Sequence, residues 1–292
     1  MKLNPKQYLL DEEKVRLYIF RAGMEGLAKP TAVLLGGQPG AGKSKILDDA
    51  FLELIRRGDT VQIVGDDLRG FHPMNRYLLK RDDKTAAFYT DLDSGRWVKK
   101  AIDEAKARRL NIIVEGTMRN SAIVAETVAK LRPEYEIDVR VLAVNFRLSE
   151  QGIMLRYEGQ KAERGVGRWT TPKAHKDGYD GMPATIEHIE RERIAVRVAV
   201  YKRDGRAIYS NEFRGGKWSR APQARAVVEA ERDRPMTSRE FRDYVEGFDR
   251  LAEALARPER RASAGEIDKI ESMRRQARKE WHELISTGKI LT

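Results

Sequence analysis

Hydrophobic and polar positions along the first two thirds of the chain alternate in a pattern that predicts strands separated by helices. Short apolar runs rich in β-branched residues predict strands at 31–35, 60–64, 111–114 and 139–144, and a fifth strand at either 196–201 or 206–209. Apolar residues at helical spacing predict helices at 9–27, 43–57 and 97–110, the first with Asp11 as its N-cap. Strands and helices in alternation are typical of βαβ units. We therefore expect the α/β fold class, with a mostly parallel sheet flanked by helices.

The composition changes after about Gly215, where arginine, glutamate and alanine dominate and β-branched residues become rare. Amphipathic stripes predict helices at 222–256, broken near Pro235, and at 263–286, with a loop at 257–261. We therefore divide the chain into an α/β domain, residues 1–214, and a C-terminal helical region, residues 215–292. Two roles stay open for this region: an appendage that packs on the core, or a surface for a partner or for regulation.

The first predicted strand leads directly into a glycine-rich segment. Its residues are Gly37, Gln38, Pro39, Gly40, Ala41, Gly42, Lys43 and Ser44, which fit the P-loop pattern G-x-x-x-x-G-K-[ST]. Backbone N–H groups of such a loop, together with the positive end of the following helix dipole, form a cradle for phosphate. We expect Lys43 to reach the terminal phosphates of ATP or GTP and the Ser44 hydroxyl to ligate Mg²⁺.

Acidic residues follow the second and third predicted strands. Asp66 and Asp67 come after the second strand, and Glu115 ends the third. Because ligands of parallel sheets bind at the carboxyl ends of the strands, we expect these acids to lie near the P-loop. In a small-molecule kinase such an acid accepts the proton of the attacking hydroxyl; helping to hold Mg²⁺ is the alternative role. The N-K-x-D pattern of GTPases is absent and no clear Walker B pair precedes a sensor arginine. We therefore expect residues 1–214 to be a P-loop kinase domain.

The residue types in the chain exclude several other kinds of site. The chain of 292 residues has no cysteine, which rules out disulfides and thiolate metal sites, and its four histidines are not at ligand spacing. His72 and His175 are expected to position loops by local hydrogen bonds. Mg²⁺ brought by a nucleotide is the only metal implied. No apolar run approaches the ~20 residues that span a bilayer, and the N-terminus lacks a signal peptide's apolar segment, so we expect a cytoplasmic location without a membrane partner.

The net charge of +11 raises the question of nucleic-acid binding. The 56 basic residues accompany 45 acidic ones, and stretches such as 229–242 mix the two signs closely, as solvated helix faces do. No basic motif with interleaved aromatic residues is present, so the pattern argues against nucleic acid and suits small anionic ligands. A nucleotide-gated nucleic-acid-binding module stays as an alternative of a different class. That alternative predicts steeply salt-dependent binding.

Five motifs, in order along the chain, resemble the zeta toxins of bacterial toxin–antitoxin systems. They are the P-loop 37–44, Asp66 six residues before His72-Pro73, Val114-Glu115-Gly116-Thr117-Met118-Arg119, Leu155-Arg156-Tyr157-Glu158, and the segment 168–175, Arg-Trp-Thr-Thr-Pro-Lys-Ala-His. The resemblance covers roughly Thr31 to Asn211. Members of that family are P-loop kinases that phosphorylate the sugar of UDP-N-acetylglucosamine and deplete a cell-wall precursor.

The resemblance implies roles for the residues of catalysis. It assigns Asp66 as the base that deprotonates the sugar hydroxyl, and Asp67 is the competing candidate because the two acids are adjacent. It assigns Arg156 and Arg168 to a lid, expected near 160–167, where they stabilise charge on the transferring phosphoryl group. Arg147 and Arg164 are nearby competitors for these two positions.

The resemblance also implies an acceptor pocket and partners. Glu115, Thr117 and Arg119 would line the pocket for a UDP-sugar, and their side chains can bond sugar hydroxyls and clamp a diphosphate. Glu115 could instead sit over the Mg²⁺. A small antitoxin protein that blocks the nucleotide pocket is the expected macromolecular partner. A kinase of another nucleotide, such as a dinucleotide cofactor, would use the same core and is the nearest alternative.

Overall fold

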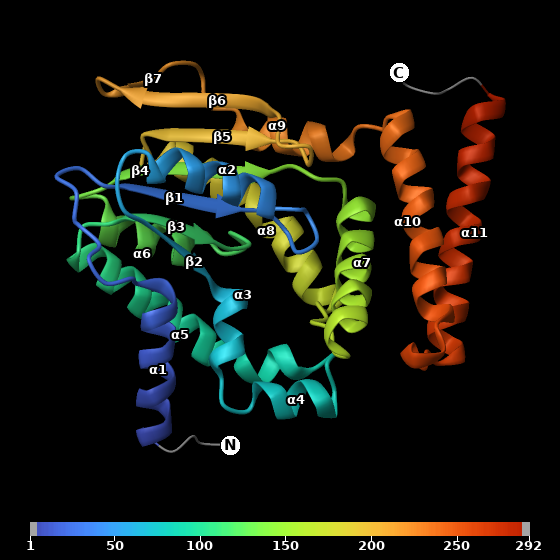
Figure 1. The fold of residues 1–292 in the computed structure, drawn as a ribbon. Helices are drawn as coiled ribbons and strands as arrows, with labels where there is room; N and C mark the ends of the chain where they lie inside the picture. The colour runs from blue at the N-terminus through green and yellow to red at the C-terminus, as the bar shows by residue number, and fades with distance from the viewer. Residues whose placement is uncertain (1–4, 288–292) are drawn as a thin grey trace.

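A single mixed sheet lies at the centre of the molecule (Figure 1). The computed structural model describes residues 5–287, and within them the strand order is β2-β3-β1-β4-β5-β6-β7. The strands are β1 Thr31–Gly36, β2 Thr60–Val64, β3 Asn111–Glu115, β4 Glu136–Leu142, β5 Arg197–Tyr201, β6 Ala207–Arg214 and β7 Lys217–Trp218. The first five are parallel, while β6 and β7 continue the sheet in antiparallel pairs. The expected mostly parallel α/β fold is confirmed.

Helices cover both faces of the sheet, as the alternation of side chains along β1 requires. They are α1 Pro5–Ile19, α2 Ser44–Ile55, α3 Gly65–Leu68, η1 Arg69–Phe71, α4 Asn75–Arg81, α5 Ala86–Ala107, α6 Ser121–Leu131, α7 Phe146–Arg164, α8 Pro172–Arg191, α9 Ala224–Asp233, α10 Ser238–Ala256, η2 Pro258–Arg260 and α11 Ala264–Ser286. Ala32 and Leu34 join the large core cluster that α5, α6, α8 and α9 complete, whereas Val33 packs on α2 from the other face. No helix among residues 5–287 combines the length and the apolar composition that crossing a bilayer requires.

Several boundaries differ from the sequence predictions. The first helix begins at Pro5 and ends at Ile19, so Asp11 lies inside it and its prediction as the N-cap was wrong. The helix predicted from Trp97 starts at Ala86 instead, because its first half buries the small side chains of Ala86, Thr90 and Ser94 and exposes larger apolar ones, so no apolar stripe marks it in the sequence. Both alternatives for the fifth strand form strands, β5 and β6, which pair as an antiparallel hairpin.

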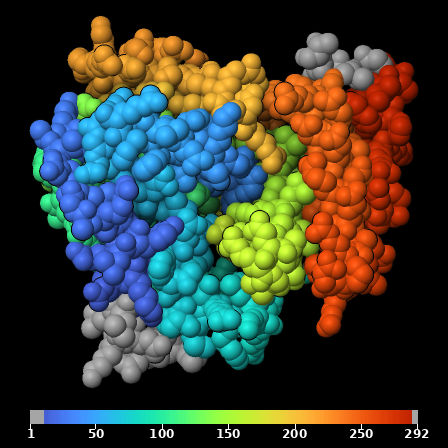
Figure 2. Space-filling view, in the orientation of Figure 1, coloured from blue at the N-terminus to red at the C-terminus, as the bar shows by residue number. Residues whose placement is uncertain are grey.

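The C-terminal helices pack in two places. The predicted break near Pro235 is confirmed, since α9 ends before it and α10 begins after it. Helix α9 contributes Ala224 and Val228 to the core beside the sheet. Helices α10 and α11 stand side by side, with α10 next to α7 (Figures 1 and 2), and Phe248 of α10 joins the cluster that includes Leu148. The boundary at 214/215 stays a prediction.

Candidate active site

The P-loop joins β1 to α2 and packs closely against α7. Gly40 has a φ of +77°, and a Cβ there would overlap the carbonyl oxygen of Ser149, so both the conformation and the contact require glycine. The Lys43 ammonium donates to the carbonyl of Gly37 at 2.9 Å and lies 3.1 Å from Glu115 Oε1. Ser44 is the first residue of α2 and is exposed. The loop therefore has a defined conformation that requires glycine at Gly40, and its lysine lies at the carboxyl end of β3.

A buried polar network supports the P-loop from behind. The Gln38 side chain is fully buried; it donates to the Val144 carbonyl at 2.7 Å and accepts from the Arg232 guanidinium at 2.9 Å. Gln38 also donates to the Ser149 hydroxyl, which lies 2.8 Å from His175 Nε2. Burial and the positive charge of Arg232 lower the pKa of His175 to about 4, so its ring is neutral near pH 7. His175 thus helps to position the loop, as expected.

Arg232 is a site-supporting residue that the sequence did not point to. It comes from α9, is 2% exposed, donates to the Tyr179 carbonyl at 2.7 Å, and holds its guanidinium 4.0 Å from the Tyr179 ring. Burial lowers the pKa of Arg232 to about 10. Because α9 contains two arginines, Arg225 and Arg232, and the contacts of Arg232 lie far away in sequence, no local signal distinguishes it.

Asp66 stands at the end of β2 between two arginines. Its Oδ1 lies 3.1 Å from Arg69 Nε and its Oδ2 lies 2.8 Å from Arg168, while the side chain keeps 41% of its surface exposed. Burial raises the pKa of Asp66, but the charges of Arg168, Arg69 and Arg156 outweigh it and hold the pKa below its ordinary value. The structure therefore brings two expected catalytic residues, Asp66 and Arg168, into direct contact.

Asp67, the competing acid, has a different environment. Partial desolvation, together with the negative charges of Glu115 and Asp66, raises its pKa above the ordinary value, although Arg168 opposes this shift. The two adjacent acids therefore have different electrostatic environments: arginines neutralise Asp66, whereas the carboxylate of Glu115 acts on Asp67.

The lid arginines converge on Asp66 from α7 and from the segment that follows it. Helix α7 continues to Arg164 and α8 begins at Pro172, so the first part of the expected lid is helical and only the segment 165–171 lies between the two helices. Arg156 donates to Thr170 at 2.9 Å, and within residues 5–287 its buried Nε has no hydrogen-bond partner. Burial and the charge of Arg168 lower the pKa of Arg156 to about 10. A desolvated cation with a spare donor is suited to an anionic ligand.

The two competing arginines lie elsewhere. Arg147 contacts Glu280 of α11 at 2.8 Å and the ring of Tyr244, and Arg164 is paired with its neighbour Glu163 and is largely exposed. Neither forms an ion pair with Asp66. The geometry therefore favours Arg156 and Arg168.

The residues expected to bind the acceptor lie at the end of β3 and just after it. Glu115 is paired with Lys43, Thr117 is half-buried beside α8, and Arg119 is exposed. Gly181 of α8 allows the backbone at Arg119 to approach so closely that a Cβ would overlap the Arg119 carbonyl. Contact with α8 therefore fixes the loop after β3. Of Glu115, Thr117 and Arg119, only Glu115 contacts the P-loop lysine.

The donor set suits a Mg²⁺ ion shared with a nucleotide. Among the described residues, no group of three or more His, Asp or Glu side chains is arranged to hold a metal by itself. The Ser44 hydroxyl and the carboxylates of Asp67 and Glu115 are the oxygen ligands that Mg²⁺ accepts, and Mg²⁺ usually completes its shell with phosphate oxygens and water. These residues therefore fit the ion expected from the P-loop.

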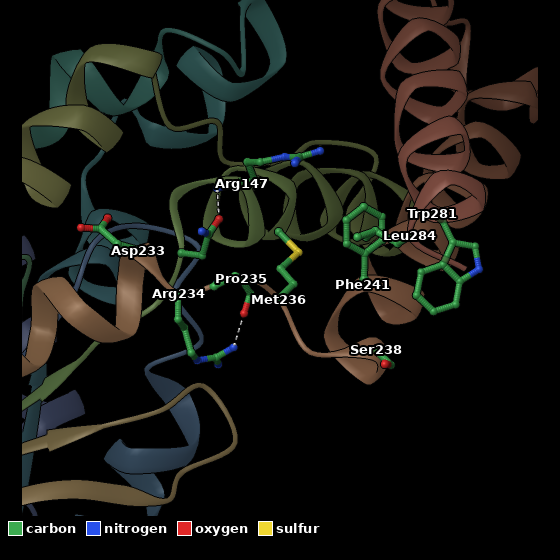
Figure 3. Close-up of a pocket in the computed structure, with 10 residues that line it drawn as sticks. Arg147, Asp233, Arg234, Pro235, Met236, Ser238, Phe241, Trp281 and Leu284 are labelled. Atoms are coloured by element: carbon green, nitrogen blue, oxygen red, sulfur yellow. Dashed lines mark hydrogen bonds between the residues drawn. The ribbon is translucent and has the colours of Figure 1, made fainter. Parts of the chain in front are cut away.

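A cavity of about 290 Å³ lies apart from these residues, where α7, the α9–α10 connection and α11 meet (Figure 3). Phe241, Trp281 and Leu284 gather on its apolar side, and Phe241 stacks on Trp281 with ring centres 5.7 Å apart. Of its lining residues, only Arg147 was considered for the site, as a competitor for a lid position.

Comparisons with known proteins agree with the geometry. The family model described as Zeta toxin matches residues 21–214. Toxin zeta of Enterococcus hirae is 29% identical over 215 residues, which are 72% of this chain and 74% of the relative. Toxin PezT of Streptococcus pneumoniae is 29% identical over 192 residues, 65% of this chain and 75% of the relative.

Solved structures share the fold. A chain of the PezAT chromosomal toxin–antitoxin system of Streptococcus pneumoniae superposes with a TM-score of 0.73 at 24% identity, covering 88% of this chain and 99% of that one. A chain of the AvrRxo1-ORF1:-ORF2 complex gives a TM-score of 0.52 at 16% identity and covers 91% and 84%. At these identities the likeness concerns the fold alone.

Proposed function

The chain belongs to the zeta toxin family, and we propose that it is a Mg²⁺-dependent kinase acting on a UDP-sugar. It would transfer the terminal phosphoryl group of ATP or GTP to a sugar hydroxyl of UDP-N-acetylglucosamine or a related UDP-sugar. The observation that carries the proposal is the meeting of Asp66 with Arg168 at 2.8 Å, with Arg156 acting on the same carboxylate, at the strand ends beside the P-loop.

The P-loop would hold the phosphoryl donor. Its backbone N–H groups and the start of α2 favour phosphate, and Lys43 would exchange Glu115 and the Gly37 carbonyl for the terminal phosphates. Ser44, with Asp67 or Glu115, would hold the Mg²⁺ that the nucleotide brings. Bound Mg²⁺ would supply neutralising charge on the phosphate oxygens.

Asp66 would act as the base. The sugar hydroxyl oxygen forms a bond to the terminal phosphorus while the bond from that phosphorus to the bridging oxygen of the departing ADP or GDP breaks, and the hydroxyl proton passes to the Asp66 carboxylate. Arg156 and Arg168 would stabilise negative charge on the transferring group. Because Arg168 must turn from Asp66 toward the phosphates, the carboxylate loses a neutralising partner and becomes a better proton acceptor.

Glu115, Thr117 and Arg119 would bind the acceptor. Glu115 can accept from a sugar hydroxyl or an amide, Thr117 can donate and accept, and the exposed Arg119 can bind a diphosphate through two parallel bonds. The loop that carries them is fixed against α8, which supports a defined orientation of the acceptor.

We further infer that the chain acts as a toxin controlled by a separate antitoxin protein that covers the nucleotide pocket. Family membership supports this inference, as do the names of the relatives and the toxin–antitoxin system from which the structural neighbour comes.

Incubation of the purified protein with ATP or GTP, Mg²⁺ and a panel of UDP-sugars and dinucleotide cofactors, followed by mass spectrometry, tests the proposal. We expect one added phosphoryl group on UDP-N-acetylglucosamine or a close relative. Phosphorylation of a dinucleotide alone would replace the proposed acceptor with the nearest alternative. The absence of any phosphorylated product while ATP still binds would overturn the kinase proposal.

A further inference from the structure

A cluster of buried charges joins the C-terminal helices to the lid. Glu158 lies on α7, two residues after Arg156, and its side chain is only 9% exposed. The Arg260 guanidinium, also 9% exposed, binds it through two bonds, Nε to Oε2 at 2.7 Å and a terminal nitrogen to Oε1 at 3.0 Å. Arg260 belongs to η2, the turn between α10 and α11. A buried, bidentate ion pair fixes the orientation of both side chains.

A second layer of charges extends this pair toward the lid. Arg260 also donates to Glu266 of α11 at 2.9 Å, and Glu266 pairs with Lys84 at 2.9 Å. The Lys84 ammonium lies 6.0 Å from the ring of Trp169, the residue that follows Arg168. The α10–α11 turn, the α4–α5 connection and the lid therefore meet at one place.

Asp83, next to Lys84, connects the lid to this cluster of charges. The Asp83 carboxylate accepts from the Tyr157 hydroxyl at 2.7 Å and from the backbone N–H of Gly167 at 3.0 Å, and Lys161 is 3.2 Å away. Tyr157 packs edge-on against Trp169, with ring centres 5.2 Å apart. Gly167 directly precedes Arg168, so any shift of α7 near Tyr157 reaches both lid arginines.

We propose that Arg260 is a positioning residue of the phosphoryl-transfer site: through Glu158 it clamps the C-terminal half of α7 and thereby holds Arg156 and Arg168 at Asp66. The inference rests on the proposed kinase function for its effect on rate, but not for its effect on the lid. Without the guanidinium, the buried Glu158 carboxylate loses its ion-pair partner, and its desolvation cost favours movement toward water. Because Glu158 belongs to α7, this movement would shift the helix. The C-terminal hairpin is thus part of the machinery of the site.

Limited trypsin digestion of the full chain tests the clamp without any substrate. Arg164 is 68% exposed at the lid boundary and supplies the cleavage site. We expect Arg260→Met to speed cleavage after Arg164 about tenfold or more relative to other sites, and Arg260→Lys to restore part of the protection. The control is Arg274→Met, which breaks a pair with Asp249 at 2.7 Å inside the hairpin, where Asp249 keeps Arg278 as a partner, and should leave the rate unchanged.

Two outcomes would overturn the clamp. One is cleavage after Arg164 at the rate of the unsubstituted chain in Arg260→Met. The other is equal acceleration at every tryptic site, which would make the pair a general contributor to stability.

Kinetics with the acceptor found for the unsubstituted chain supply a second readout. We expect Arg260→Met to lower kcat about tenfold or more while KM for ATP changes less than about twofold, because lid arginines act on the transition state. A KM increase at constant kcat would contradict the positioning role. A chain that phosphorylates nothing would end the kinase proposal, while the digestion result would still decide the clamp.

Discussion

Several charged residues of the site are paired with one another in this structure. Lys43 is paired with Glu115, and Asp66 with Arg168 and Arg69. A nucleotide and an acceptor must therefore exchange these pairs for contacts with phosphate and hydroxyl groups. Such exchange lowers the cost of desolvating the site, because the charges are already partly shielded from water and held by partners.

The choice between Asp66 and Asp67 is testable by paired substitutions. We expect Asp66→Asn to lower kcat for UDP-sugar phosphorylation by about 10² or more, because the general base is lost. Asp67→Asn should retain most of kcat and raise the Mg²⁺ requirement if Asp67 helps to hold the ion. The reverse result, with Asp67→Asn inactive and Asp66→Asn active, would move the base to Asp67. Circular dichroism checks that both variants fold.

His175 gives the stability of the protein a dependence on pH. Its pKa is about 4 in the folded state against 6.5 as the ordinary value, so the unfolded chain binds the proton first as the pH falls from 6.5 to 4. Folding stability is therefore lost over that window, by up to about 3 kcal/mol. In His175→Gln this contribution is absent. Urea unfolding at several pH values should give a flatter profile for the variant, and identical slopes would contradict the assignment.

The sequence allowed residues of local motifs to be predicted, but not residues that packing brings to the site from distant parts of the chain. The P-loop, Asp66 and Glu115 were found because each follows a predicted strand. Arg232 contacts Gln38 across 194 positions, and Arg260 contacts Glu158 across 102. No spacing rule connects such pairs, since packing of the helices alone brings them together.

At the scale of elements, helix α8 determines where the loop after β3 lies. Its small residues let the backbone around Arg119 pack directly on the helix. The strands of the sheet could be predicted from apolar runs. Helices α7 and α8 could not, because charged residues and glycines interrupt the row of side chains that each helix buries. The position of the lid between them follows only from the fold.

Gly181→Ala should disturb the acceptor loop. The added Cβ overlaps the Arg119 carbonyl, so we expect a loss of about 1–3 kcal/mol in unfolding free energy and a raised KM for the acceptor, with KM for ATP little changed. The matched control is Gly95→Ala on α5, where nothing lies within 4 Å of the new Cβ and better helix propensity should add about 0.5–1 kcal/mol. Equal effects of the two substitutions on stability and KM would contradict this account of the packing.

The whole molecule depends on its C-terminal region in two places. Helix α9 completes the core beside the sheet through Val228, and the α10–α11 pair covers apolar residues of α7 such as Leu148 and Met154. A chain ending at residue 214 would expose both surfaces. Hydrophobic burial of this extent is a major part of the stability of a domain.

We therefore expect the chain 1–214 to lack a cooperative urea transition or to unfold at a clearly lower midpoint than the full chain. Fluorescence of Trp97, which is 1% exposed in the core, can follow the unfolding. An unchanged midpoint would mean that the first 214 residues fold on their own and that the C-terminal region is an independent appendage.

The most direct test of the central claim is the set of nucleotide sugars in bacteria that express the chain. We expect expression to arrest growth and to accumulate a UDP-amino-sugar carrying one additional phosphoryl group, identified by mass spectrometry of cell extracts. Lys43→Met, which removes the P-loop cation, should abolish both effects. Growth arrest without a phosphorylated UDP-sugar, or the same product with Lys43→Met, would contradict the claim that this site is a UDP-sugar kinase.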